Sequence, residues 1–213
     1  MKNIAIIGAG GFGRETKVLI DAINLKCETY NIIGFFDDNF EKNIIINGLP
    51  ILGKVSDINN IDKPLSLAFG VAAPNVKKEI FDKIVNKNID YPNLIHPSVL
   101  ISNDDVILGK GITICAGSII TCNIKIKNFV TLNLSCTVGH DTIVEDFCSF
   151  MPTVNISGEV LIKESVYVGT GAKIINQLEI GKNTIVGAGA VVAKSLPDNC
   201  TAVGIPAKPI KFH

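Results

Sequence analysis

The sequence contains no tryptophan, has only 6% aromatic residues, and carries no excess of either charge. Its 20 basic residues balance 20 acidic ones, which leaves no electrostatic argument for binding nucleic acid or an anionic membrane. Scarce aromatics also weaken any hypothesis of base stacking, since such sites use aromatic platforms. We therefore expect no nucleic acid among the partners of this chain.

Long apolar runs are missing as well. No stretch approaches the roughly 18 apolar residues of a membrane-spanning helix. The start, Met1-Lys2-Asn3, leads into only four apolar residues before Gly8, whereas the apolar region of a signal peptide has about 7–15 residues. We expect no membrane insertion and a cytoplasmic location.

The six cysteines include no Cys-x-x-Cys spacing. A zinc ribbon and a redox motif are therefore unsupported, and no metal is expected. Cys136 and Cys148 fall at a position of the sequence repeat described next that otherwise holds small or apolar residues. We interpret both as packing residues of the core.

A bulky apolar residue recurs at every sixth position over more than 80 residues. The series consists of Leu108, Ile114, Ile120, Ile126, Leu132, Val138, Val144, Phe150, Ile156, Ile162, Val168, Ile174, Ile180, Val186 and Val192. A period of six is neither that of a helix nor that of a simple strand, and it is typical of the hexapeptide repeats of β-helices. With three units per coil, the series predicts a triangular parallel β-helix of about five coils, without helices or long loops between Leu108 and Val192. The period does not fix the hand, and parallel crossovers are right-handed in about 98% of cases.

The N-terminal region has a different pattern. Ile4–Ile7 reads as a buried strand, and an amphipathic helix is expected from Arg14 to Leu25. Between them, Gly8, Gly10 and Gly13 fit the G-x-G-x-x-G spacing, in which backbone and helix N-terminus approach a phosphate closely.

Further strands are expected at Ile32–Phe36, before Asp37 and Asp38, and at Leu65–Phe69, before Gly70; a second helix is expected over residues 74–87. This is one βαβαβ half, whereas dinucleotide sites use two. Half a site suits one nucleotide, such as the diphosphate of a nucleotide-sugar, with the acidic pair reaching the ribose or base. A glycine-rich turn without a ligand is the alternative.

Five short segments, in this order, resemble a family of bacterial sugar acetyltransferases. They are Gly8–Gly13, Phe35-Phe-Asp-Asp, Leu94-Ile-His-Pro-Ser, Val138-Gly-His-Asp and Val203-Gly-Ile-Pro-Ala-Lys. The family includes UDP-4-amino-sugar N-acetyltransferases and sialic-acid O-acetyltransferase-like proteins, and the resemblance covers nearly the whole chain. It implies an α/β + β architecture: a Rossmann-like nucleotide-sugar-binding domain over residues 1–92 and a left-handed parallel β-helix acyltransferase domain over residues 93–213. It also implies a homotrimer that closes each site between neighbouring subunits.

Of the three histidines, His140 is the candidate catalytic residue. His213 is the last residue, and His96 precedes Pro97 at the domain junction. His140 occupies a repeat position that points away from the core, where a positioned imidazole could take a proton from a nucleophile that attacks a thioester. Asp141 could fix its tautomer, but adjacent residues of a regular strand face opposite ways, so this pair requires a corner or a bulge. In the family the catalytic histidine followed by an acidic residue matches His140 and Asp141.

The resemblance assigns the remaining site residues. An asparagine that holds the acceptor sugar matches Asn133, and the other residues expected to bind the nucleotide-sugar are Gly8, Gly10, Gly11, Phe12, Asp37, Asp38 and Gly70. A second histidine that contacts the acetyl donor in some members is replaced by Ser149. The positions that match the groove for acetyl-CoA, together with a lysine that could meet a phosphate of CoA, are Gly158, Gly169, Thr170, Gly187, Ala188 and Lys208.

The resulting hypothesis is an acetyl-CoA-dependent acetyltransferase that acts on a nucleotide-linked amino-sugar in bacterial polysaccharide biosynthesis, with a histidine general base. An O-acetyltransferase of sialic acid or a similar sugar, a catalytically silent sugar-nucleotide-binding scaffold and an NAD-dependent oxidoreductase remain as alternatives. Acceptors that bear an amine, a hydroxyl or no nucleotide distinguish the first two, thiol release from acetyl-CoA tests the third, and protection by NAD tests the fourth.

Overall fold

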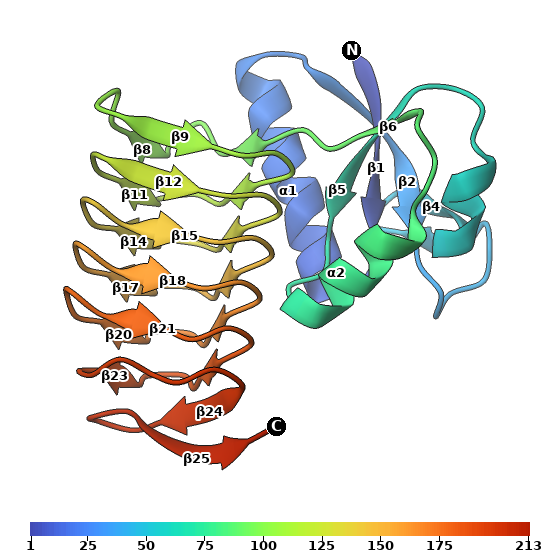
Figure 1. The fold of residues 1–213 in the computed structure, drawn as a ribbon. Helices are drawn as coiled ribbons and strands as arrows, with labels where there is room; N and C mark the ends of the chain where they lie inside the picture. The colour runs from blue at the N-terminus through green and yellow to red at the C-terminus, as the bar shows by residue number, and fades with distance from the viewer. The chain divides into compact units, whose positions relative to one another are not determined.

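The computed structural model describes all residues from 1 to 213, which divide into two compact units, Met1–Pro97 and Ser98–His213. Figure 1 shows a sheet with helices in the first unit and a stack of short strands in the second. Neither helix of the chain is long and apolar enough to cross a membrane. The units are described separately below.

The first unit is built on a six-stranded sheet. In chain order its strands are β1 (Lys2–Ile7), β2 (Tyr30–Phe36), β3 (Ile45–Ile46), β4 (Leu49–Gly53), β5 (Leu65–Phe69) and β6 (Ile89–Asp90). Their order in the sheet is β3-β4-β2-β1-β5-β6, and every pairing is parallel except that of β3 with β4. Ile4–Ile7 of the central strand β1 are at most 1% exposed, in agreement with the uninterrupted apolar run typical of a parallel strand covered on both faces.

Two helices accompany this sheet, α1 (Gly11–Lys26) and α2 (Pro74–Lys83). The predicted strands and helices are confirmed, although α1 begins earlier than predicted and α2 ends before residue 87. The connection from β2 to β5 contains the β3–β4 hairpin and a 3-10 helix (Val55–Asn60) instead of a helix that covers the sheet. Strand β4 escaped the sequence analysis because it contains Pro50, a residue that strands tolerate only at edges or near their ends.

The second unit is a parallel β-helix, and no helix interrupts it. It follows β7 (Leu94–Ile95). Its strands are β8 (Leu100–Ile101), β9 (Val106–Leu108), β10 (Thr113–Ile114), β11 (Ile119–Ile120), β12 (Ile124–Ile126), β13 (Thr131–Leu132), β14 (Thr137–Val138), β15 (Ile143–Val144), β16 (Ser149–Phe150), β17 (Asn155–Ile156), β18 (Leu161–Ile162), β19 (Tyr167–Val168), β20 (Lys173–Ile174), β21 (Glu179–Ile180), β22 (Ile185–Val186), β23 (Val191–Val192), β24 (Cys200–Val203) and β25 (Lys208–Phe212).

These strands form three faces, as the triangular prediction requires. The β14 face has the order β23-β20-β17-β14-β11-β8, the β15 face has the order β21-β18-β15-β12-β9, and the β16 face includes β22, β19, β16, β13 and β10 and ends in the hairpin of β24 and β25. Residues in contact on adjacent coils are 18 positions apart, as in the bond between Lys127 and Glu145. Three hexapeptides therefore make one coil, and the five strands of the β15 face agree with the predicted number of coils (Figure 1).

The apolar series fills the interior of the β-helix. Every member from Ile114 to Val192 is at most 3% exposed, and only Leu108, at the start, is half-buried. The thiols of Cys136 and Cys148 donate hydrogen bonds inside this core, to the carbonyl oxygens of Met151 at 3.3 Å and Lys163 at 3.0 Å. Both cysteines are at most 1% exposed and are packing residues, as predicted, and burial raises the pKa of the Cys136 thiol to about 11.

A left-handed backbone conformation recurs at every sixth residue and forms the corners of the coils. The residues with positive φ in this register are Asp105, Gly111, Gly117, Asn123, Phe129, Ser135, Asp141, Phe147, Thr153, Glu159, Ser165, Gly171, Gln177, Asn183 and Gly189. This conformation costs roughly 1–2 kcal/mol for a residue with a side chain. Backbone hydrogen bonds between coils offset that cost, as where the Asp141 N–H donates to the Cys122 carbonyl at 3.2 Å.

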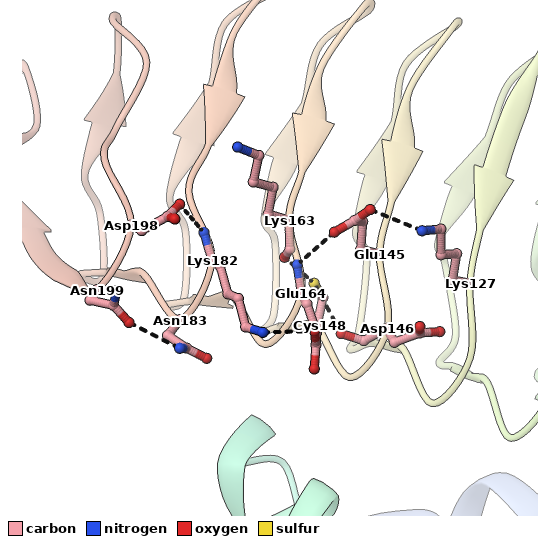
Figure 2. A network of polar contacts seen from close by, with 10 residues as sticks. All are labelled: Lys127, Glu145, Asp146, Cys148, Lys163, Glu164, Lys182, Asn183, Asp198 and Asn199. Carbon is pink, nitrogen blue, oxygen red and sulfur yellow. Dashed lines mark hydrogen bonds and ion pairs between the residues drawn. The ribbon is translucent and has the colours of Figure 1, made fainter.

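Charged side chains form a ladder along part of the β-helix (Figure 2). Lys127 Nζ lies 2.9 Å from Glu145 Oε1, and Glu145 Oε2 accepts a hydrogen bond from the Glu164 N–H at 3.2 Å. Lys182 continues the ladder, with its Nζ 3.1 Å from Glu164 Oε2 and its N–H donating to Asp198 Oδ1 at 2.7 Å. Exposed ion pairs contribute only about 0–1 kcal/mol each, so these contacts support the register of the coils while apolar burial supplies most of the stability.

Substitution of Phe150 by alanine tests whether apolar burial supplies most of the stability of the β-helix. Phe150 is fully buried in the β-helix, and truncation of a buried phenylalanine costs about 3–5 kcal/mol. Phe212→Ala makes the same chemical change at a side chain that is 65% exposed, and it should cost less than about 0.5 kcal/mol. Denaturant unfolding followed by circular dichroism measures both, and equal losses would contradict the inward assignment of the six-residue series.

Candidate active site

His140 and Asp141 form a corner of the β-helix, between β14 and β15. Asp141 has a φ of 58°, a conformation that aspartate adopts more readily than most residues. The corner removes the alternation of a regular strand, so both side chains lie on the same outer edge. His140 Nδ1 is 2.7 Å from Asp141 Oδ2, and the corner that this pair requires is therefore present.

The carboxylate of Asp141 is held by two neighbours. Besides His140, the side chain of Asn123 donates a hydrogen bond from Nδ2 to Asp141 Oδ1 at 3.1 Å. The bond with His140, followed by that with Asn123, lowers the pKa of Asp141 from its ordinary value. Asn123 was missed by the sequence analysis, although it precedes Asp141 by one coil of 18 residues, and that period would have found it.

The imidazole of His140 presents one nitrogen to its surroundings. A carboxylate only accepts hydrogen bonds, so its partner Nδ1 carries the proton, and in the neutral ring Nε2 then has a free lone pair. The side chain is 56% exposed, and Nε2 has no hydrogen-bond partner within the chain. An imidazole whose tautomer is fixed in this way can accept a proton at Nε2.

Gly158, predicted to contact acetyl-CoA, occupies the equivalent corner on the next coil. A Cβ atom placed on Gly158 would come within 2.5 Å of both Cε1 and Nε2 of His140. Gly158 therefore lies directly against the imidazole of His140 and belongs to the same site.

Ser149 and Asn133 lie on another side of the β-helix from His140. Ser149 belongs to β16, is fully buried, and has a hydroxyl without a hydrogen-bond partner. Asn133 directly follows β13 and is 4% exposed, and its Oδ1 accepts a hydrogen bond from the Leu134 N–H at 2.7 Å. The single chain therefore does not bring these two predicted site residues to the His140 corner.

The other residues predicted for acetyl-CoA gather along one edge. Gly169 and Thr170 follow β19, and Gly187 and Ala188 follow β22, at equivalent corners of adjacent coils. A Cβ on Gly169 would meet the Ala188 N atom at 2.6 Å, so close stacking of the coils already requires this glycine. Lys208 is exposed at the start of β25.

Three glycines of the N-terminal loop pack against one another. A Cβ on Gly13 would lie 1.9 Å from the Gly8 carbonyl oxygen, and a Cβ on Gly70 would lie 2.5 Å from the Gly13 Cα. Gly8 also has a φ of 92°. Gly8, Gly13 and Gly70 are thus explained by the close approach of α1 to the ends of β1 and β5.

Gly10 and Gly11 differ from these, because a Cβ at either position would meet nothing within 4 Å. Gly10 is the N-cap of α1 and supplies no side-chain cap, and no acidic residue lies in the first turn. The N–H groups of that turn, which carry a positive partial charge, are free of side-chain acceptors. Phe12 lies in the same turn and is half-buried. This end of α1 retains the capacity to bind an anionic group.

The two carboxylates after β2 have different partners. Asp37 is 8% exposed, and its two oxygens accept hydrogen bonds from the N–H groups of Ala9 at 2.7 Å and Asn39 at 2.8 Å. Asp38 is exposed and uses only Oδ1, which accepts from the Val55 N–H at 2.8 Å. Asp37 therefore fixes the glycine loop, while Asp38 has an oxygen available to a ligand.

A cavity of about 220 Å³ lies beside these groups. Residues of several elements line it, among them Gly8, Asp38, Val55, Glu79 and Lys83. The last two come from α2 and were missed by the sequence analysis. Only the topology of the sheet brings α2 to the ends of β1 and β2, so no local signal marked them.

Comparison with protein families and curated proteins gives matches to both units. Residues 3–84 match the family described as PglD N-terminal domain, and residues 159–194 match bacterial transferase hexapeptide (six repeats). GDP-perosamine N-acetyltransferase from Escherichia coli O157:H7 is 31% identical over 223 residues, which cover 99% of this chain and 97% of that protein.

Two solved structures are similar over their whole length. The acetyltransferase domain of PglB from Neisseria gonorrhoeae FA1090 has a TM-score of 0.90 and 30% identity, covering 99% of this chain and 100% of that chain. PerB from Caulobacter crescentus, in complex with CoA and GDP-perosamine, has a TM-score of 0.88 and 29% identity, covering 99% and 98%. The fold, the order of its two units and this similarity along the whole length agree, and this chain belongs to the family of hexapeptide-repeat sugar acetyltransferases.

Proposed function

We propose that this protein transfers the acetyl group of acetyl-CoA to the amine of a nucleotide-linked amino-sugar. The observation that carries the proposal is the exposed His140–Asp141 corner, in which Nδ1 is bonded to a carboxylate at 2.7 Å and Nε2 is free. A solvated surface histidine needs no such partner, whereas a general base benefits from one that orients the ring and stabilises the imidazolium.

In the proposed acetyl transfer, His140 and Asp141 each have a defined role. The sugar amine attacks the thioester carbonyl carbon, a C–N bond forms, and the C–S bond breaks. Nε2 of His140 takes the proton that the nitrogen loses, while the carboxylate of Asp141, whose pKa is lowered by its hydrogen bonds, stabilises the charged ring. The proton then passes to the departing thiolate, so that the products are the N-acetyl sugar and CoA. A base of this kind contributes about 10²–10⁴-fold to the rate.

The relatives favour an amine over a hydroxyl as the acceptor. The Escherichia coli relative is described as an N-acetyltransferase, and the Caulobacter crescentus protein was solved with CoA and GDP-perosamine. That protein was also crystallised with one histidine replaced by asparagine or by alanine. We infer an N-acetyltransferase of bacterial polysaccharide biosynthesis. An O-acetyltransferase would instead release thiol only with hydroxyl acceptors, and a silent scaffold would release none.

Two binding regions supply the substrates. The nucleotide diphosphate is assigned to the domain of residues 1–92, with its phosphates at Gly10 and Gly11 and its ribose or base near Asp38. Acetyl-CoA is assigned to the edge of Gly169 and Gly187, with Lys208 near a phosphate, whereas the fully buried Ser149 offers its hydroxyl to no ligand in the single chain. Asn133 is assigned to the sugar. His140 lies at a different corner from the CoA edge, which supports a homotrimer in which neighbouring chains complete each site.

Replacement of His140 tests the catalytic assignment. His140→Ala should lower kcat by about 10²–10⁴-fold in a thiol-release assay with acetyl-CoA and UDP-, GDP- or dTDP-linked amino-sugars. Asp141→Asn should cost less, because it disturbs only the orientation of the imidazole and the charge beside it. His213→Ala removes a histidine at the chain end and should leave turnover near that of wild type. Wild-type turnover in His140→Ala would refute the general-base mechanism.

The same substitution at the two carboxylates after β2 tests which of them contacts the nucleotide-sugar. Asp38→Asn keeps an oxygen for the Val55 N–H but replaces the second oxygen by an uncharged NH₂ donor, so it should raise the KM of the nucleotide-sugar about tenfold and leave stability and the KM of acetyl-CoA unchanged. Asp37→Asn places an NH₂ group against one of two N–H donors and should cost about 1–3 kcal/mol of stability. Steady-state kinetics and denaturant unfolding measure both. The reverse pattern would show that Asp37 contacts the ligand.

The assembly is tested by sedimentation. A cyclic homotrimer has three equivalent interfaces and three equivalent sites, so velocity and equilibrium runs should give three times the chain mass at assay concentrations. A dilution series that compares specific activity with the trimer fraction completes the test. Full activity in a sedimenting monomer would show that one chain contains a complete site.

A further inference from the structure

Gly158 is the only glycine at its position in the repeat. Residues at the equivalent place, one before each left-handed corner residue, are Asp104, Lys110, Ala116, Cys122, Asn128, Leu134, His140, Asp146, Pro152, Gly158, Glu164, Thr170, Asn176, Lys182 and Ala188. Positive φ does not account for the glycine, because Gly158 is not among the glycines with that conformation. The β-helix therefore accepts side chains at this place, and another constraint explains the glycine.

The constraint is the ring of His140. The three atoms nearest to a Cβ built on Gly158 all belong to that imidazole: Cε1 and Nε2 at 2.5 Å and Cδ2 at 2.9 Å. Glycines directly after strands elsewhere in the β-helix have other neighbours: a Cβ on Gly139 would meet the Ser157 carbonyl carbon at 2.6 Å, and one on Gly187 would meet the Val203 side chain at 2.7 Å. At Gly158 the close neighbour is a functional side chain from the preceding coil.

We propose that Gly158 is a positioning residue for the general base, an inference that rests on the proposed function. Because Gly158 has no side chain, the imidazole can lie against the next coil while Nδ1 reaches Asp141 at 2.7 Å. An alanine would displace the ring by about 1 Å, a misplacement that can cost about 10²-fold in rate. The displacement would separate Nδ1 from its carboxylate and redirect Nε2, the atom that accepts the proton.

This role differs from a contact with acetyl-CoA, for which glycine would be needed to let the donor approach the backbone. A donor contact would raise the KM of acetyl-CoA whether or not the imidazole is present. A positioning role acts on kcat and depends on the imidazole. The two roles are therefore separated by combining substitutions at positions 140 and 158.

The experiment is a double-mutant cycle of His140→Ala and Gly158→Ala. In the wild-type background Gly158→Ala should lower kcat by about 10–10²-fold with the KM of acetyl-CoA unchanged. In the His140→Ala background the same change should alter residual turnover by less than about twofold, because the ring it displaces is absent. Ala116→Gly, at the same repeat position on another coil, is the control and should leave kcat unchanged.

Equal losses from Gly158→Ala in both backgrounds, or a raised KM of acetyl-CoA with kcat retained, would overturn the proposal. Absence of thiol release by the wild-type protein with every nucleotide-linked amino-sugar would instead refute the proposed function, so the two failures are distinguishable. Thermal unfolding supplies a second reading if Gly158→Ala folds poorly. The double variant should then recover the lost melting temperature, since removal of the ring makes room for the methyl group, and absence of that recovery would count against the proposal.

Discussion

The stacking of one coil on the next, 18 residues along the chain, is the constraint on which the rest of the β-helix depends. A left-handed residue at every corner allows each short strand to turn and its amide groups to bond the coil before it. Because the register is fixed in this way, any residue has as neighbours the residues one coil earlier and one coil later. The chemistry of a corner is thus decided by three coils at once.

The His140 corner shows this most clearly. Asn123 from the preceding coil holds the carboxylate of Asp141, and Gly158 from the following coil leaves room for the imidazole. The left-handed conformation of Asp141 brings its side chain to that of His140. The backbone of the β-helix holds each of these groups in position, and this preorganisation is what the proposed proton acceptor requires.

In the N-terminal unit, some residues of the glycine loop and of the acidic pair are fixed by packing and hydrogen bonds, and others are not. Gly8, Gly13 and Gly70 let helix and loops approach closely, while Gly10 and Gly11 remain open. Both carboxylate oxygens of Asp37 accept hydrogen bonds from backbone N–H groups, whereas only one oxygen of Asp38 does. Residues of the same type in one motif thus differ in role. Packing explains some of the glycines, and hydrogen bonds to the backbone explain Asp37.

The sequence by itself determined the β-helix, its inward residues and the outward direction of His140, because a six-residue period is a local property that every unit repeats. It also determined the main strands, the two helices and the glycine loop of the first unit. Only the tertiary structure decided that His140 and Asp141 meet, that Asn123 and Gly158 flank them, that Asp37 is a structural residue, and that Glu79 and Lys83 line the cavity. Those facts depend on contacts between coils or between separate elements, where small differences in backbone angle and packing decide which atoms touch.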